Sequence, residues 1–364
     1  LTIAQQQMVE IAKALSTNAK IIILDEPTAA LTANESEKLY RIVEKLRDEG
    51  KSIIFISHRF EDMYRLASRV TVFRDSQYIG TYDVNGISNE DLIKAMVGRE
   101  IKDMYPKKDI KIGEEIFRIE GMTRTGFFKD ISLDVKAGEI VGLTGLVGAG
   151  RTETMESVCG ITKPDAGKVY LEGKELKIRK PEDAMKAGII LLPEDRQHQG
   201  LILSWGLGRN VTLPIQANLA KAGFNDEKTE RQIAKTRLEE VDTKAVDIFQ
   251  PASSLSGGNQ QKVVVAKALA QEHMKVVIMD EPTKGIDVSA KAEIYEIMGE
   301  LAEKGYGIIM ISSEMPEIIG MADRIFVMCN GRVSGCLDRR EVSQERILEL
   351  SMEQSKKKAK EGEA

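Results

Sequence analysis

The sequence predicts an α/β protein that carries two copies of one domain plan. Residues 255–287 read LSGGNQQK, then an apolar helix, then VVIMDEPTKGID. The chain opens on a related stretch, in which LTIAQQQM is followed by a similar helix and by IIILDEPTAALT. Apolar runs that alternate with amphipathic helices are typical of a mostly parallel sheet. Two copies of that pattern predict a tandem repeat.

The spacing between the two copies gives the length of one repeat and the position of residue 1 within it. Leu1 matches Leu255 and Asp25 matches Asp280, so the offset is 254 to 255 residues. A whole repeat is therefore longer than the stretch that precedes the second copy. We expect residue 1 to lie deep inside the first repeat of an N-terminally truncated chain.

The elements of the first copy follow from periodicity and turn residues. A run such as 21–24, apolar throughout, suits a buried parallel strand, and the helix and strand behind it suit a right-handed crossover. The expected elements are a helix over 1–15, a strand at 21–24, a helix over 34–49, a strand at 53–57, a hairpin over 70–82 and a helix over 88–97.

A polar, basic stretch then separates the two copies. We assign residues 1–98 to the C-terminal part of the first domain, 99–114 to a linker, 115–354 to the second domain and 355–364 to a disordered, lysine-rich tail. In the second domain we expect strands at 116–119, 131–135, 140–143 and 188–191, a helix over 152–158, a hairpin at 168–171, and helix throughout 209–243.

Composition narrows the classes of function. The 364 residues carry 52 basic and 57 acidic side chains, for a net charge of −5, so counting reveals no basic surface for nucleic acid. The three cysteines form no close pair and no metal-type spacing, which suits reduced thiols. The apolar runs are far shorter than the roughly 20 residues that span a bilayer, so a membrane role must be peripheral.

A glycine-rich loop follows the strand at 140–143 and opens a helix. Glycines let backbone N–H groups turn toward phosphate oxygens, the helix N-terminus adds partial positive charge, and a hydroxyl can ligate Mg²⁺. Taken alone, a glycine-rich turn between strand and helix is common. Its residues are Gly145, Leu146, Val147, Gly148, Ala149, Gly150, Arg151 and Thr152, with Arg where a phosphate-binding loop has Lys.

Two acid pairs, Asp25-Glu26 and Asp280-Glu281, each end an apolar strand. There the Asp can hold the Mg²⁺ hydration shell while the Glu orients or deprotonates an attacking water. Acids at strand ends are often only solvated, but this pair occurs twice with Pro-Thr behind it.

Other polar groups precede the helices. Ser256, Gly257 and Gly258 could offer a hydroxyl and backbone amides to a γ-phosphate, or could form an ordinary N-cap with flexible glycines. His58 follows its strand and could hydrogen-bond a γ-phosphate, although a surface His is usually idle. Its counterpart, Ser313, cannot do the same work at that reach.

Together, LSGGNQQK, the two DEPT segments and GLVGAGRT resemble ABC-type ATPases over nearly the whole chain. The resemblance implies P-loop NTPase domains, each with a mostly parallel mixed sheet, an antiparallel β subdomain and a helical subdomain. LTIAQQQ with LLPEDR narrows the likeness to the tandem ATP-binding subunits of bacterial importers for ribose, xylose, galactose and similar sugars. In that family two ATP molecules with Mg²⁺ lie between the phosphate loop of one domain and the signature of the other.

The resemblance implies two unequal sites. One joins Asp25, Glu26 and His58 to the signature residues Ser256, Gly257, Gly258 and Gln260, with its phosphate loop expected upstream of Leu1. The other joins loop 145–152, Asp280 and Glu281 to LTIAQ, with Glu194 where relatives carry a Gln that contacts Mg²⁺. Catalytic roles fall on Glu26, His58 and Glu281, and metal contacts on Thr152, Glu194, Asp25 and Asp280. We expect the second site to bind nucleotide but hydrolyse it poorly.

The implied function is Mg²⁺-dependent ATP hydrolysis that energises sugar uptake. The implied partners are an integral membrane sugar permease and, through it, an extracytoplasmic sugar-binding protein. No nucleic acid is expected among the partners. The subunit would lie on the cytoplasmic face of the cell membrane as a peripheral protein. The alternative is a soluble tandem ABC ATPase acting on ribosomes or DNA. A ribosomal type would carry a long helical linker, and a DNA type zinc cysteines or coiled coils. A binding module without turnover is a further alternative for this stretch.

Overall fold

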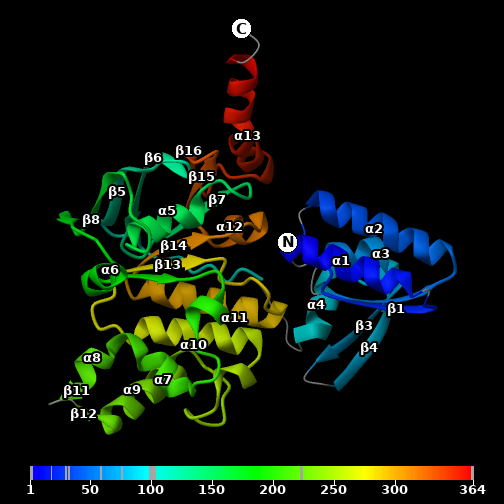
Figure 1. Cartoon of the computed structure of the whole chain (residues 1–364), viewed down its shortest axis with the longest axis horizontal. Coiled ribbons are helices and arrows are strands. Elements are labelled where there is room, and N and C mark those ends of the chain that lie inside the picture. The colour runs from blue at the N-terminus through cyan, green and yellow to red at the C-terminus, as the bar shows by residue number, and fades with distance from the viewer. Residues whose placement is uncertain are drawn as a thin grey trace. The chain divides into compact units, whose positions relative to one another are not determined.

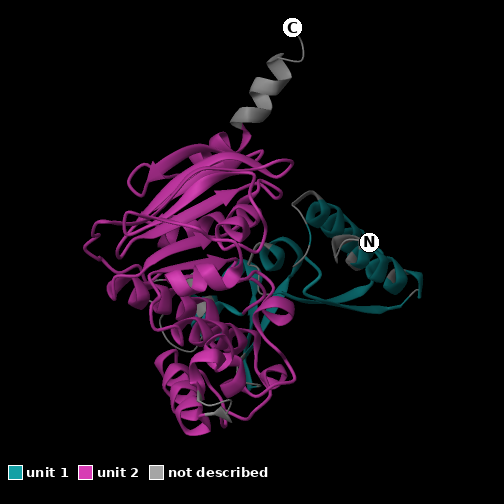
Figure 2. Cartoon of the chain, turned by 60° about the vertical axis from the view of Figure 1, so that its left-hand side comes forward, with its two compact units in different colours: residues 1–103, 287–289 teal, residues 104–286, 290–364 magenta. Residues whose placement is uncertain are grey.

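The computed structural model describes residues 3–361 apart from 18, 29–30, 32, 58–59, 75–76, 98–103 and 222–223. The chain forms two compact units, residues 1–103 with 287–289 and residues 104–286 with 290–364 (Figure 2). Each unit encloses its own clusters of buried apolar side chains.

The first unit is built on one strand–helix–strand crossover. Strands β1 (Ile21–Asp25) and β2 (Ser52–Ile56) pair in parallel, as predicted, and α2 (Ala33–Asp48) connects them. Buried Ile22 and Leu24 pack with Leu39 and Val43 of α2. The other elements are α1 (Ile3–Ser16), α3 (Phe60–Leu66), the antiparallel hairpin of β3 (Arg69–Arg74) and β4 (Gln77–Asp83), the 3₁₀ turn Val84–Gly86, and α4 (Asn89–Val97).

Strand β1 has one face in the core of this unit. Ile22 and Leu24 face the core, whereas Ile21 and Ile23 are 60% and 63% exposed. The matching strand of the second unit, β13 (Val276–Asp280), is buried at every residue because a second apolar layer covers its other face.

The second unit combines a six-stranded sheet with a four-stranded antiparallel sheet (Figure 1). The larger sheet has the order β10-β13-β14-β7-β15-β16, and all its pairs are parallel except β15 with β16. Its strands are β7 (Ile140–Gly145), β10 (Ile189–Leu192), β13, β14 (Gly307–Ile311), β15 (Arg324–Cys329) and β16 (Arg332–Asp338). The antiparallel sheet, in the order β6-β5-β8-β9, contains β5 (Glu115–Arg124), β6 (Phe128–Lys136), β8 (Ala166–Leu171) and β9 (Lys174–Leu176).

Alternate residues of the central strands feed two separate cores. In β13, Val277 and Met279 face the core that contains α10 (Gly257–Leu269) and α11 (Val288–Glu303). Val276 and Ile278 face the core that contains α5 (Arg151–Val158) and the antiparallel sheet. The larger sheet therefore lies between two layers, and the carboxyl ends of β7 and β13 are left to carry polar groups.

One prediction of the second unit needs correction. The region 209–243 is not helical throughout, because a small hairpin interrupts it. In chain order it contains α7 (Leu207–Thr212), a 3₁₀ turn (Leu213–Ile215), α8 (Gln216–Leu219), the hairpin strands β11 (Ala220–Lys221) and β12 (Phe224–Asn225), and α9 (Glu227–Glu240). Asp226 caps α9 and so marks where helix resumes. Helix α13 spans Gln344–Glu361. The disordered tail expected at 355–364 stays a prediction.

The remaining helices complete the covering layers. They are α6 (Pro181–Ala187), α12 (Met315–Met321), a π-helical turn (Arg196–Gly200) and a 3₁₀ turn (Ala252–Ser254). Among the described residues, no helix combines the length and apolar character needed to cross a bilayer.

Candidate nucleotide site

The glycine loop connects β7 to α5 and has the backbone that its glycines allow. Gly145, Gly148 and Gly150 have φ angles of 151°, 80° and 92°. A Cβ atom on Gly145 would lie 2.2 Å from the carbonyl oxygen of Met328, whereas next to Gly148 the space is open to 4 Å. The loop thus packs against the sheet at its start and is open at its middle, above the first turn of a helix, where phosphate oxygens can approach N–H groups.

The acid pair of the second unit lies at the end of β13. Glu281 has a φ of 45°, which is unusual for a residue with a side chain, and its N–H donates to the carbonyl of Ile311 at 2.9 Å. The hydroxyl of Thr152, on the first turn of α5, is close enough to Asp280 to lower the pKa of that carboxyl. The structure therefore brings the glycine loop and the acid pair together in one site.

The electrostatics at Asp280 suit a divalent cation. Burial, with smaller contributions from Glu194 and Glu281, raises the pKa of Asp280 to about 7, although the Thr152 hydrogen bond and Arg151 oppose the shift. Asp280 Oδ1 is buried and has no hydrogen-bond partner among the described residues. The described residues contain no group of three or more His, Cys, Asp or Glu side chains that could hold a metal ion. The protein ligands offered to a cation here are therefore one carboxylate, of Asp280, and one hydroxyl, of Thr152. Mg²⁺ commonly takes one or two protein ligands and completes its shell with substrate phosphates and waters, so these residues fit it.

Arg151 turns toward the acids. Its Nη1 donates to the carbonyl oxygen of Ser312 at 2.9 Å and lies 3.7 Å from Glu281 Oε1, and both side chains are 11% exposed. Burial raises the pKa of Glu281, whereas hydrogen bonds from Ser313 and the charge of Arg151 act in the opposite direction. The cation that replaces lysine thus holds the acid expected to act on water.

Glu194 lies next to this site but is already paired. Its Oε1 is 2.6 Å from Nζ of Lys284, which follows the DEPT segment, and its side chain is 41% exposed. The Glu194 carboxylate adds to the negative field at Asp280. The Glu194 carboxylate can therefore bind a cation at Asp280 only if it breaks its ion pair with Lys284 or binds both partners at once.

The signature residues form the start of α10. Ser256 is the N-cap, and its hydroxyl accepts from Asn259 Nδ2 at 3.1 Å. A Cβ atom on Gly258 would lie 2.3 Å from Cβ of Ala290, so this glycine permits close helix packing. Gln260 is buried, and its Nε2 donates to the carbonyls of Ala252 and Leu255 at 3.2 and 3.3 Å. Its contacts are therefore internal to the second unit.

The first unit repeats the geometry of the acid pair. Glu26 has a φ of 44°, and its N–H donates to the carbonyl of Ile56 at 2.9 Å, as Glu281 does in the second unit. Asp25 ends β1 as Asp280 ends β13. His58 lies outside the described residues. The pairing of Asp25, Glu26 and His58 with the signature stays a prediction.

Two buried acids were missed by the sequence reasoning. Glu317 accepts from Thr283 of the second DEPT segment at 2.7 Å and from Ser312 Oγ at 2.9 Å. Asp62 accepts from Thr28 at 2.5 Å and from Ser57 at 2.8 Å in the same way. Because these acids are also 255 positions apart, aligning the two copies residue by residue would have found them.

An aromatic ring beside the glycine loop was also missed. A Cβ atom on Gly150 would lie 3.0 Å from the carbonyl oxygen of Phe127, so residue 127 borders the loop. The Phe127 ring is 47% exposed, with the guanidinium carbon of Arg124 4.0 Å from its centre. A flat, half-exposed ring at this place can stack on a planar base.

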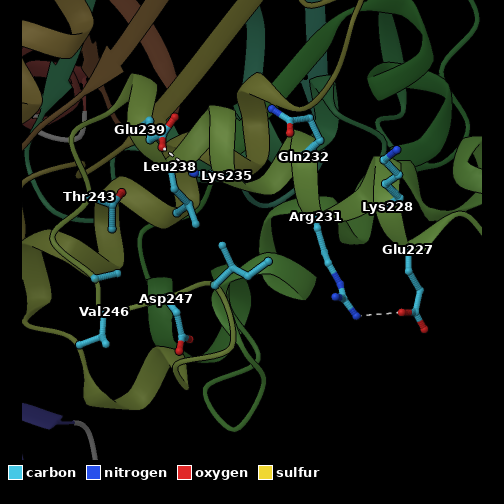
Figure 3. Close-up of a pocket in the computed structure, with 12 residues that line it drawn as sticks. Glu227, Lys228, Arg231, Gln232, Lys235, Leu238, Glu239, Thr243, Val246 and Asp247 are labelled. Carbon is cyan, nitrogen blue, oxygen red and sulfur yellow. Dashed lines mark hydrogen bonds and ion pairs between the residues drawn. The ribbon is translucent and has the colours of Figure 1, made fainter.

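A cavity of about 820 Å³ lies apart from these site residues, beside helix α9 (Figure 3). Helix α9 and residues 243–248 line it, and the ion pair of Arg231 with Glu227 spans 2.9 Å on one side. Val246, on its rim, is 91% exposed. None of the glycine-loop residues, acid pairs or signature residues lines this cavity.

Comparison with known proteins identifies the family. The family model described as ABC transporter matches residues 128–284. The ribose import ATP-binding protein of Rhodococcus jostii is 49% identical over 348 residues, which cover 96% of this chain and 69% of that protein. The chain belongs to the ABC transporter family of ATP-binding proteins. A protein of the same name from Geobacillus kaustophilus is 44% identical over 348 residues, 96% of this chain and 70% of its own length.

Solved structures agree on the fold. An ATP-binding cassette of an ABC transporter, MJ1267, has a TM-score of 0.56 at 24% identity and covers 65% of this chain and 98% of its own. The cassette cbiO1 from Clostridium perfringens has a TM-score of 0.55 at 24% identity, with 66% and 94% covered. The predicted P-loop ABC ATPase fold is confirmed by the family and these structures, and the resemblance to the ATP-binding subunits of sugar importers is confirmed by the relatives named for ribose import.

Proposed function

We propose that this protein hydrolyses ATP with Mg²⁺ to energise uptake of ribose or a similar simple sugar through a separate membrane permease. The observation that carries the proposal is the 43 to 49% identity over 96% of the chain to proteins named for ribose import. The partners would be an integral membrane permease and, through it, an extracytoplasmic sugar-binding protein. The subunit would sit on the cytoplasmic face of the membrane.

In the second unit the site residues divide the work of holding the nucleotide. The N–H groups of loop 145–152 would bind phosphate oxygens, Thr152 and Asp280 would hold Mg²⁺, and the Phe127 ring would stack on the base. Mg²⁺, when bound, neutralises charge on the phosphates and favours the ionised form of Asp280. Glu281, at the end of the same strand, would orient water.

The two sites are proposed to differ in hydrolysis. Arg151 holds Glu281 at 3.7 Å, and Ser313 stands where the first copy has His58. A glutamate with a cationic partner is a poorer base toward water, so the site with loop 145–152 would bind nucleotide and turn it over slowly. The other site keeps Glu26, His58 and the complete signature.

Single-turnover hydrolysis by the full-length protein tests this difference. We expect Glu26→Gln to abolish most of the fast phase and Glu281→Gln to leave most of it. Nucleotide binding by both variants serves as the control for folding. Equal losses of the fast phase in the two variants would sink the proposed asymmetry.

The segment after Glu194 is proposed to face the permease, through about Thr243. Charge reversal at Asp195 is a poor test, because Asp195 caps the π-helical turn through Gln197 and His198 at 3.0 Å each. Glu194→Gln removes the ion pair with Lys284 and the contribution of this carboxylate to the negative field at Asp280, and leaves the cap of the turn in place. It should reduce sugar uptake per ATP hydrolysed more than it reduces basal hydrolysis; the opposite ranking would count against this orientation.

A further inference from the structure

The π-helical turn Arg196–Gly200 is fastened at both ends. Asp195 accepts from the N–H groups of Gln197 and His198, and its Oδ2 lies 2.9 Å from His198 Nδ1. At the other end Nζ of Lys267, on α10, donates to the carbonyl of Gly200 at 2.9 Å. π-Helical turns are frequent at functional sites, and these bonds make the turn a small rigid body.

Arg196 extends from this turn to the loop behind the second acid pair. Its Nη1 donates to the carbonyl of Lys284 at 2.6 Å and its Nη2 to the carbonyl of Gly285 at 3.0 Å. Because the guanidinium is a planar fork, it can hold two successive carbonyls, which a lysine ammonium cannot match in geometry. The N–H of Lys284 in turn donates to the carbonyl of Glu281 at 3.1 Å. Arg196 is therefore one turn away from the acid pair.

The same side chain also abuts the signature. A Cβ atom on Gly257 would lie 2.8 Å from Arg196 Nη2 and 3.0 Å from the carbonyl oxygen of Gly285. Beside it, Nε2 of Gln197 donates to Oε1 of Gln260 at 3.2 Å. The turn thus contacts the loop at 284–285 and the first turn of α10 at once.

We propose that Arg196 is a positioning residue that makes the π-helical turn, the loop at 284–285 and the start of α10 move as one body. A displacement of the turn would then shift Ser256 and Gly257 together with the peptide that follows Glu281. The linkage rests on the contacts above; only the source of the displacement, a permease docked on the segment after Glu194, rests on the proposed function.

Hydrogen–deuterium exchange of this chain without nucleotide tests the linkage. The variants are Arg196→Gln and Arg196→Lys, and the control is Arg237→Gln, whose Nη1 donates to Glu240 within α9 at 2.8 Å. Loss of charge-assisted hydrogen bonds should raise exchange at 284–287 and 256–260 about tenfold in Arg196→Gln, and less in Arg196→Lys. A rise confined to 196–200, or the same rise in Arg237→Gln, would overturn the proposal.

Kinetics of the full-length protein provide a readout that simple loss of structure would not give. Arg196→Lys should lower kcat for ATP hydrolysis about tenfold while nucleotide affinity changes less than about twofold, because the hydrogen bonds of Arg196 go to the carbonyls of Lys284 and Gly285. Parallel loss of affinity and kcat would contradict a positioning role. If Arg196→Gln does not fold in a thermal melt, Arg196→Lys carries both measurements. Since exchange requires neither nucleotide nor permease, failure to transport sugar would overturn the proposed function and leave the linkage standing.

Discussion

Replacing Asp280 with Asn should stabilise the metal-free protein at neutral and alkaline pH. Asp280 is 3% exposed, and its pKa rises from 3.8 to about 7, chiefly because burial disfavours its charge. The folded state therefore binds a proton that the unfolded state releases. The stability linked to that proton is fully present below about pH 4 and is lost as the pH rises through 7.

The size of the effect follows from the shift. About three pH units at 1.36 kcal/mol each give at most about 4 kcal/mol at high pH. Between pH 5 and pH 8 the wild-type protein should lose about 2 to 3 kcal/mol from this group. Asparagine keeps the shape of the side chain without the charge, so the Asp280→Asn protein should not lose this part.

Urea unfolding in EDTA, without nucleotide, at pH 5, 6.5 and 8 measures the difference between the two proteins. Comparing their slopes cancels the other groups that titrate in this range. Glu272→Gln, at an exposed acid, is the matched control and should run parallel to wild type. Parallel curves for wild type and Asp280→Asn would refute the argument that burial of this carboxylate opposes its charge.

Two further predictions concern packing and burial in the second unit. Gly258→Ala should destabilise the protein by about 1 to 3 kcal/mol, because the new Cβ would lie 2.3 Å from Cβ of Ala290. Adding Ala290→Gly to this variant should recover most of the lost stability in thermal melts. If stability is not recovered, the strain does not come from this contact. Glu317→Gln breaks a buried pair with Lys291 at 2.9 Å and should cost about 3 to 5 kcal/mol in urea unfolding. Glu314→Gln, at a 52% exposed partner of the same lysine, should cost under about 1 kcal/mol, and equal costs would contradict the role of burial.

The repeat explains why so much of the fold could be predicted. The crossover inferred from the first copy forms as β1-α2-β2, and the second copy repeats it as β13-α11-β14. The failure occurred where neighbours decide. The region 209–243 was expected to be helical throughout, but the paired strands β11 and β12 interrupt its helices.

The candidate site could be predicted where one short segment carries the chemistry. Loop 145–152 and the acid pairs are contiguous motifs, so their residue types were readable directly. Glu317 and Phe127 were not, because their roles depend on contacts with segments distant in the sequence, such as Thr283 and Gly150. A lone acid or aromatic residue has no local pattern that marks it.

By itself the sequence determined the family, the tandem repeat and the residues that can bind phosphate and Mg²⁺. These properties depend on local backbone freedom and on chemical groups that lie close together in short segments of the chain. Only the tertiary structure decided how these groups are tuned. The pKa of Asp280 depends on burial and on Glu194 and Glu281, and Arg151 meets Glu281 only because β7 and β13 belong to one sheet. Burial and the distance between charges are set by segments far apart in the chain, so they arise only when the chain folds.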